Sequence, residues 1–253
     1  MLSSAIWWAG LMAEAALLAC AVRGRFLARY PLFYGYLSAV LLRSLLLVVI
    51  YQRFPAAYAR TYWYSQFLLV LLGCGVVWEI YRRALHQYPG VVRMAQNVIP
   101  FLFALSASRV IAKAWESPKW LPGATTLETE RDLRIVQAAL LAGLVALALY
   151  YAVPLGKNLK GMIVGYGFFL ATSLVQLTAR NNLGESFQSA WQILQPTSYL
   201  LSLIFWLVAL WSYAPAPKPQ HESRLEVDYQ ALLKATRRGL GTTRTRLSRT
   251  IGS

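Results

Sequence analysis

Apolar residues follow one another along this chain in long blocks that short polar segments separate. Seven blocks are long enough to cross a bilayer as helices, because about 20 residues at roughly 1.5 Å each span its hydrocarbon core. We predict membrane spans at residues 2–22, 31–52, 62–82, 97–115, 133–153, 159–177 and 187–213. The fold class that follows is all-α, a polytopic membrane protein with a seven-transmembrane-helix bundle.

Composition and charge support a membrane protein rather than a soluble one. Of the 253 residues, 57% are hydrophobic, whereas soluble domains contain about 45–50% apolar residues. The formal net charge is +15, which in a soluble protein would indicate nucleic acid as a partner. In a membrane protein such a charge reflects topology and attraction to anionic lipid. We therefore expect a lipid bilayer and no nucleic acid among the partners.

The distribution of lysine and arginine predicts the orientation in the membrane. The connections that follow the first, third and fifth spans are basic, whereas the opposite connections hold most of the loop acids, Glu116, Glu128, Glu130, Asp132 and Glu185. Because basic connections stay in the cytoplasm, we place the N-terminus outside and the C-terminus inside. The chain is then a multi-pass protein of the cytoplasmic membrane.

Two segments outside the apolar blocks have their own patterns. Residues 1–213 form the predicted membrane domain, and residues 214–253 form a Pro-rich linker, an amphipathic helix and a basic end. Tyr229 lies on the apolar face of that helix, which we expect to contact anionic lipid or a cytoplasmic protein. Between the fourth and fifth spans, Pro118 and Pro122 predict an irregular loop, with Thr126 or Thr129 capping the fifth helix.

Charged residues within the predicted spans are the first candidates for a site. Arg43 lies in the middle of the second span, where an arginine normally faces protein or water and has a partner. Glu14 in the adjacent antiparallel span predicts a buried ion pair, which either holds the two helices together or forms a proton- or ion-coupled site. Arg109 either extends to the outer interface or, with Lys113, lines an anion-binding vestibule.

A polar stripe on the last span predicts an inward-facing surface. It has the spacing i, i+4, i+7, i+11 and consists of Gln188, Gln192, Gln195 and Tyr199. Because amides in hydrocarbon must be hydrogen-bonded, this face either bonds to neighbouring helices or lines a polar pocket together with Arg109 and Gln176. On the sixth span, Gly161 and Gly165 form a small-xxx-small pair, which predicts close helix packing.

Few residues in the sequence indicate catalysis. The chain contains no Walker A motif, dinucleotide-binding glycine pattern, HExxH or GxSxG,. His86 and His221 are its two histidines and both fall on the predicted cytoplasmic side, so we expect no metal or haem centre in the bundle. We predict a protein that is not an enzyme and needs no cofactor.

Two functions remain open from the sequence. The first is a sensory or scaffolding role for the seven-helix bundle, with a possible small-molecule ligand in the polar pocket. The second is small-solute transport by a three-plus-one-plus-three arrangement of helices. Residues 9–41 resemble residues 142–174, as a parallel repeat of three helices joined by a linker helix would require. This topology is similar to that of small sugar transporters, and also of rhodopsins and seven-helix receptors, but no motif selects one of them.

Overall fold

The computed structural model describes residues 2–24, 26–116, 122–183, 188–212, 227–231, 234 and 236. Side chains at 2–4, 107, 109–116, 122–129, 181, 183 and 188 lie outside this description. Within these ranges the chain is helical and has no strand. The helices are α1 (Leu2–Arg23), α2 (Phe26–Arg29), α3 (Pro31–Arg53), α4 (Pro55–Ala84), α5 (Pro89–Glu116), α6 (Pro122–Tyr150), α7 (Lys157–Leu183) and α8 (Gln188–Leu210).

Within the described residues, six helices are long and apolar enough to cross a membrane: α1, α3, α4, α6, α7 and α8. Their outward faces carry exposed aliphatic side chains, such as Leu42, Val49, Val175 and Val208. An apolar surface of this extent is unfavourable in water and favourable in lipid. The protein is therefore membrane-embedded. Helix α5 coincides with the remaining predicted span, and its crossing of the membrane stays a prediction.

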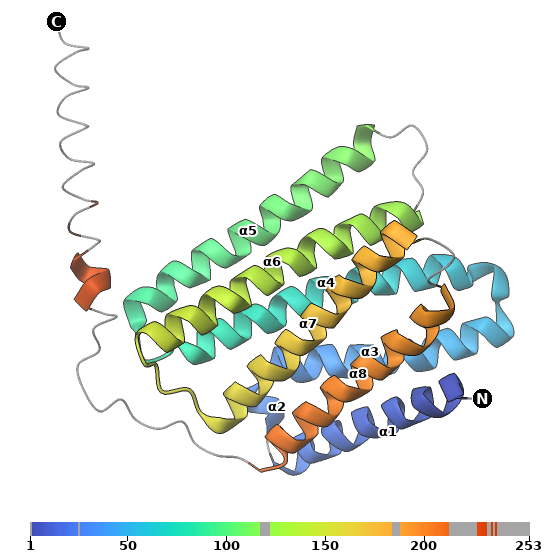
Figure 1. Ribbon diagram of the computed structural model, residues 1–253, viewed down its shortest axis with the longest axis horizontal. Helices are drawn as coiled ribbons and strands as arrows, with labels where there is room; N and C mark the ends of the chain where they lie inside the picture. The colour runs from blue at the N-terminus through green and yellow to red at the C-terminus, as the bar shows by residue number, and fades with distance from the viewer. Residues whose placement is uncertain are drawn as a thin grey trace, which may run out of the picture.

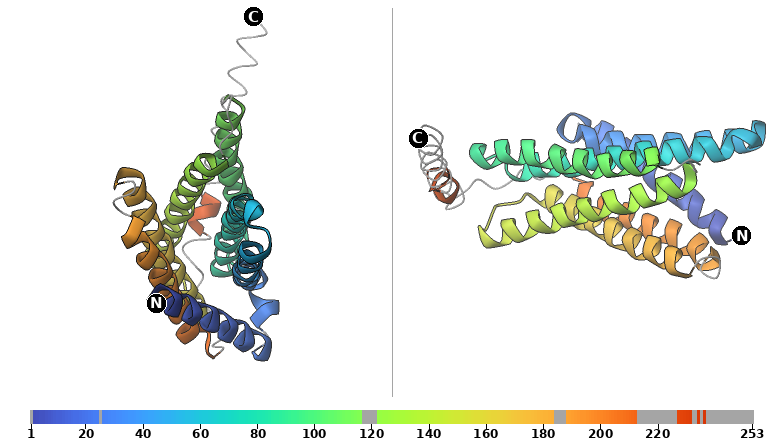
Figure 2. Two further views of the ribbon diagram at one scale, coloured as in Figure 1. Left: turned by 90° about the vertical axis from the view of Figure 1, so that its right-hand side faces the viewer. Right: turned by 90° about the horizontal axis from the view of Figure 1, so that it is seen from above.

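The long helices lie side by side in two layers that α1 joins. Helices α3, α4 and α5 form one layer, and α6, α7 and α8 form the other (Figures 1 and 2). Helix α1 packs against α3 and α8, while α6 packs against α4 and α7. The contacts therefore close a ring of α1, α3, α4, α6, α7 and α8, and α5 lies outside it against α4 and α6.

Several helices extend beyond the apolar blocks that predicted them. Helices α3, α4, α5 and α6 each begin at a proline, which is favoured in the first turn because its missing N–H would have no intrahelical partner there. The prediction of an irregular loop over residues 117–132 is therefore wrong from residue 122 onward. Helix α6 begins at Pro122, so Glu130 lies two turns inside a helix rather than at a capped start.

The half of the bundle opposite the N-terminus is filled by a tightly packed core. Trp206 of α8 is fully buried, packs edge-on against Phe33 of α3 at 5.1 Å between ring centroids, and stacks on Tyr166 of α7 at 6.4 Å. Gly161 and Gly165 of α7 face α8, where an added methyl group would collide with Ala209 and with the Trp206 indole respectively. The small-xxx-small pair thus lies where α7 and α8 approach closely.

Polar side chains bind helix ends in this tightly packed half of the bundle, opposite the N-terminus, which we call the closed side. Proline at position 31 has no N–H, and α3 has no side-chain cap from its own N-cap residue. Glu79 of α4 accepts hydrogen bonds from the backbone N–H groups of Phe33, at 2.9 Å, and Leu32. Asn158 of α7 donates to the carbonyl groups of Ala209 and Ser212, at 2.9 and 2.8 Å. The hydrogen bonds of Glu79 and of Asn158 thus satisfy backbone groups that a helix end leaves unpaired.

The predicted amphipathic tail helix lies mostly outside the described residues. Residues 227–231 are described and are helical. Tyr229, which the sequence places on the apolar face, packs against the core at the closed side of the bundle. The linker and the basic end of the tail, residues 214–226 and 237–253, lie outside the described residues.

Candidate functional site: a polar pocket in the N-terminal half of the bundle

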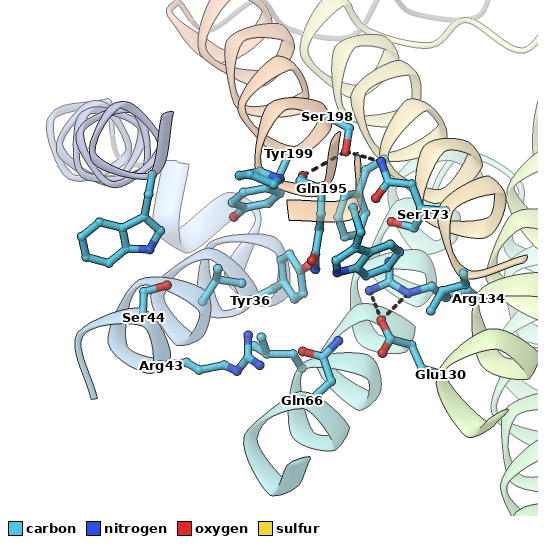
Figure 3. A pocket seen from close by; sticks show the side chains of 18 residues that line it. Tyr36, Arg43, Ser44, Gln66, Glu130, Arg134, Ser173, Gln195, Ser198 and Tyr199 are labelled. Atoms are coloured by element: carbon cyan, nitrogen blue, oxygen red, sulfur yellow. Dashed lines mark hydrogen bonds and ion pairs between the residues drawn. The ribbon is translucent and has the colours of Figure 1, made fainter. Parts of the chain in front are cut away.

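A cavity of about 300 Å³ lies inside the bundle, in the half that contains the N-terminus. Trp7 and Trp191, near the N-terminal ends of α1 and α8, line it, and so do Phe169 and Tyr199, near the middles of α7 and α8. Polar side chains from α3, α4, α6, α7 and α8 line the cavity (Figure 3). They are Tyr36, Arg43, Ser44, Gln66, Glu130, Arg134, Ser173, Gln176, Gln195, Ser198 and Tyr199.

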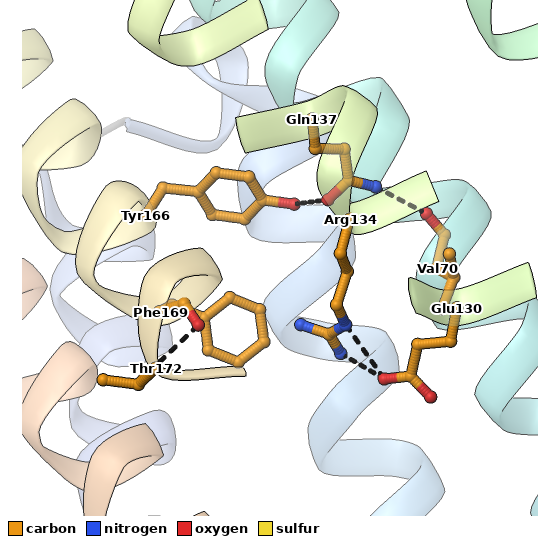
Figure 4. Close-up of polar contacts among 7 residues, drawn as sticks. All are labelled: Val70, Glu130, Arg134, Gln137, Tyr166, Phe169 and Thr172. Atoms are coloured by element: carbon orange, nitrogen blue, oxygen red, sulfur yellow. Dashed lines mark hydrogen bonds and ion pairs between the residues drawn. The ribbon is translucent and has the colours of Figure 1, made fainter. Parts of the chain in front are cut away.

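A buried ion pair forms one wall of the cavity. Arg134 and Glu130 are one turn apart on α6, and their side chains are 12% and 8% exposed. The Arg134 Nε and Nη2 groups donate to Glu130 Oε1 at 2.9 and 2.6 Å (Figure 4). The guanidinium also lies 4.8 Å from the centre of the Phe169 ring, an attractive cation–π geometry. Both hydrogen bonds end on Oε1, and no hydrogen bond joins Glu130 Oε2 to another described residue.

Arg43 lies on the opposite wall, and its described partners are neutral. Its Nε group donates to Ser65 Oγ at 2.9 Å, and its guanidinium lies 4.7 Å from the centre of the Tyr62 ring. Its Nη2 atom is buried and has no hydrogen-bond partner among the described residues. An arginine is charged at every accessible pH, so this wall carries a positive charge that no acid in the described part of the chain pairs with.

Glu14 and Arg43, which the sequence predicts as an ion pair, have different partners in the structure. Glu14 is 2% exposed, and its Oε1 accepts a hydrogen bond of 2.6 Å from the Tyr199 hydroxyl, while Oε2 has no partner among the described residues. The reason is the helix packing. Helix α1 packs more extensively on α8 than on α3, so Glu14 faces α8, whereas Arg43 reaches toward α4.

Tyr36 lies between the two walls of the cavity (Figure 3). Its side chain is buried and lines the cavity. Arg43, Glu130 and Arg134 line the same cavity, and Glu14 is bonded to its residue Tyr199. Such a group of charged residues within a membrane bundle is characteristic of functional sites.

The predicted polar stripe of α8 is divided by the structure. Gln195 and Tyr199 line the cavity, and Gln176 of α7 joins them, donating to Ser198 Oγ at 2.9 Å and to the Leu194 carbonyl at 3.3 Å. Gln192 is exposed and does not line the cavity. The side chains of Arg109 and Gln188 lie outside the described residues, so their predicted place in the pocket is untested.

A hydrogen-bonded network lies at the end of the cavity that is nearest the tightly packed core. A smaller hollow of about 10 Å³ continues from it, room for about one water molecule. There the Tyr166 hydroxyl contacts the Gly73 carbonyl at 3.0 Å and Gln137 Oε1 at 3.2 Å, and Gln137 donates to the Val70 carbonyl at 3.3 Å (Figure 4). A Cβ atom at position 73 would lie 2.7 Å from the Tyr166 hydroxyl, so glycine is required for this contact.

Sequence reasoning missed the residues of α6 that face the cavity. Glu130 and Arg134 were expected at the outer end of a span and its loop, because charges end a hydropathy block. Their spacing was the available signal: Glu130, Arg134 and Gln137 follow i, i+4, i+7 and share one helix face. Among the described residues, no three histidine, cysteine, aspartate or glutamate side chains gather in a way that would hold a metal ion.

Comparison with known proteins adds no further assignment. No protein family matches the chain, and no curated protein sequence or solved structure is similar to it.

Proposed function

We propose that this protein is a multi-pass receptor of the cytoplasmic membrane, which binds a small polar solute in the 300 Å³ cavity and has no catalytic role. The observation that carries the proposal is the cavity itself: charged and amide side chains line a hollow that stops at mid-depth above a tightly packed core. Charged residues in a membrane are rare and commonly mark ligand or ion sites, and a purely scaffolding role does not explain a cavity lined by them.

The distribution of basic residues supports an outward-facing cavity. Arg23, Arg29, Arg82, Arg83 and Lys157 lie at the closed side of the bundle, opposite the N-terminus. Basic segments remain on the cytoplasmic side, so the cavity would face the exterior and the core would seal the cytoplasmic side. The basic tail would then lie at the inner surface, where anionic lipid or a cytoplasmic protein receives the signal.

The test measures ligand binding by the purified wild-type protein and by a variant in which a large side chain fills the cavity. Thermal unfolding would be followed in the presence of a panel of small carboxylates, amino acids, amides and sugars. Ser173→Trp places a large side chain on the cavity wall, and Val175→Trp places the same side chain on the lipid-facing side of the same helix. We expect a panel member to stabilise the wild type and Val175→Trp, but not Ser173→Trp. Stabilisation by no member, or equal stabilisation of both variants, would refute the proposal.

A transporter is the second candidate, and the helix contacts favour it. In a parallel repeat with α5 as linker, α1, α3 and α4 would form the first repeat and α6, α7 and α8 the second. Helix α1 packs on α3 of its own repeat and on α8 of the other, and α6 likewise packs on α7 of its own repeat and on α4 of the other. In each repeat the second and third helices form the most extensive pair. Uptake of a bound solute into proteoliposomes, lost in Ser173→Trp, would establish transport. Binding without uptake would favour the receptor.

A further inference from the structure

The cavity has a positive charge, that of Arg43, with which no acid among the described residues pairs. Arg43 contacts a serine hydroxyl and a tyrosine ring, and its Nη2 atom is buried without a partner among the described residues. An unpaired charge in a low-dielectric interior is strongly unfavourable. The empty protein therefore has, on this wall, an interaction that an anion would complete.

The two acids near the cavity do not supply this anion. Glu130 accepts two hydrogen bonds from Arg134, and this pair is neutral as a unit. Glu14 accepts the hydrogen bond of the Tyr199 hydroxyl and does not line the cavity. Among the described residues, neither acid pairs with Arg43, so an anion that enters the cavity would supply the charge that contacts its guanidinium.

From these contacts we infer that the cavity binds a small monocarboxylate, whose carboxylate group pairs with the Arg43 guanidinium. This inference rests on the proposed ligand-binding function and names the ligand class. A guanidinium matches a carboxylate with two parallel hydrogen bonds. Ser44 and Gln66 line the same wall and can donate further hydrogen bonds, while Trp7 and Trp191 offer aromatic surface to the rest of the ligand.

One carboxylate fits the cavity better than two. The Oε2 atom of Glu130, on the opposite wall, has no hydrogen bond to the described residues and keeps its share of negative charge. A second anionic group on the ligand would meet this oxygen and find no free counter-charge, because Arg134 is already paired with Glu130, and burying an unpaired charge is unfavourable,. Dianions such as succinate and sulfate are therefore disfavoured.

The experiment compares benzoate with benzamide, a neutral molecule of nearly the same shape, and adds a zwitterion and two dianions. Benzoate, benzamide, glycine, succinate and sulfate would be titrated into the purified full-length protein at constant ionic strength, with tryptophan fluorescence and the unfolding midpoint as readouts. We expect benzoate to bind at least about tenfold more tightly than benzamide, since hydrogen bonds to a charged group exceed neutral ones by roughly 1.4 kcal/mol or more. Equal binding of benzamide, or tighter binding of glycine, succinate or sulfate, would overturn the inference.

Variants locate the carboxylate on Arg43. Arg43→Lys keeps the charge but loses the paired donors, and benzoate affinity should fall about tenfold or more. Arg60→Gln removes an exposed arginine of α4 outside the cavity and should change nothing. Gln66→Glu places an acid on the cavity wall next to Ser65, the partner of Arg43. It should raise the unfolding midpoint of the ligand-free protein and abolish benzoate binding, which tests the inference even if Arg43 variants fold poorly.

The outcomes separate this inference from the function it rests on. If neutral solutes stabilise the wild type and benzoate does not, the monocarboxylate is wrong and ligand binding stands. If benzoate binds equally well to wild type and Gln66→Glu, its carboxylate does not lie at Arg43 and the inference fails. If no solute of either panel binds, both proposals fail.

Discussion

The capping of α3 by Glu79 predicts a large effect from one side chain that belongs to another helix, α4. Glu79 is 5% exposed and accepts hydrogen bonds from the N–H groups of Leu32 and Phe33. Glu79→Ala leaves both donors buried without a partner, at about 1–3 kcal/mol each. We therefore expect the free energy of unfolding to fall by about 2–5 kcal/mol, because part of the strain relaxes.

Glu79→Gln separates the hydrogen bond from the charge. Glutamine keeps an acceptor oxygen but loses the negative charge at the positive end of the α3 dipole, which is worth about 0.3–1 kcal/mol and up to about 2 in buried geometries. We expect a loss of about 1–2 kcal/mol. Reversible unfolding in mixed micelles, titrated with dodecyl sulfate and followed by tryptophan fluorescence, measures both variants.

A matched control removes a carboxylate that caps nothing. Asp132 is 40% exposed and its side chain pairs with the adjacent Arg131 at 3.5 Å, so Asp132→Asn should change the free energy of unfolding by less than about 0.5 kcal/mol. The capping argument fails if Glu79→Ala behaves like this control. It also fails if Glu79→Gln is more harmful than Glu79→Ala, since glutamine retains the acceptor.

Three further predictions follow from the packing. Gly73→Ala should lower the free energy of unfolding by about 1–3 kcal/mol because its methyl group meets a tyrosine hydroxyl, whereas Gly75→Ala, with only an ordinary contact at 3.7 Å, should be neutral in the same unfolding titration. Arg134→Met should cost about 3–5 kcal/mol by leaving Glu130 unpaired, and adding Glu130→Met should recover much of that loss in a double-mutant cycle. Ala152 adopts φ 48° after α6, so Ala152→Gly should stabilise by about 1 kcal/mol, seen as a higher unfolding midpoint.

Much of the membrane architecture could be predicted because it depends on local chemistry. A run of apolar residues in lipid must form a helix, since no water is present to satisfy its backbone, and the helices α1, α3 and α8 end close to the predicted boundaries. The boundaries of α4, α5 and α6 were predicted less well. These helices begin at proline and contain polar or charged residues before their apolar blocks start, so hydropathy could not detect helix outside the hydrocarbon.

The site was predicted in part. A polar face on α8 was visible in the spacing of Gln195 and Tyr199, and the need of Arg43 for a partner followed from its position in an apolar block. Its pairing with Glu14 did not follow, because the sequence gives the depth of a residue in the membrane but not the direction in which its side chain faces. That direction depends on which helices become neighbours.

The sequence by itself determined that this protein lies in a membrane, which segments form its long helices and which of their residues are too polar to face lipid. Only the tertiary structure decided that α1 packs on α8, that Arg134 neutralises Glu130, and that Arg43 is left with neutral partners at the edge of a cavity. The physical reason is that hydropathy acts on each segment separately, whereas pairing of buried charges depends on distances of a few ångströms between segments far apart in the chain.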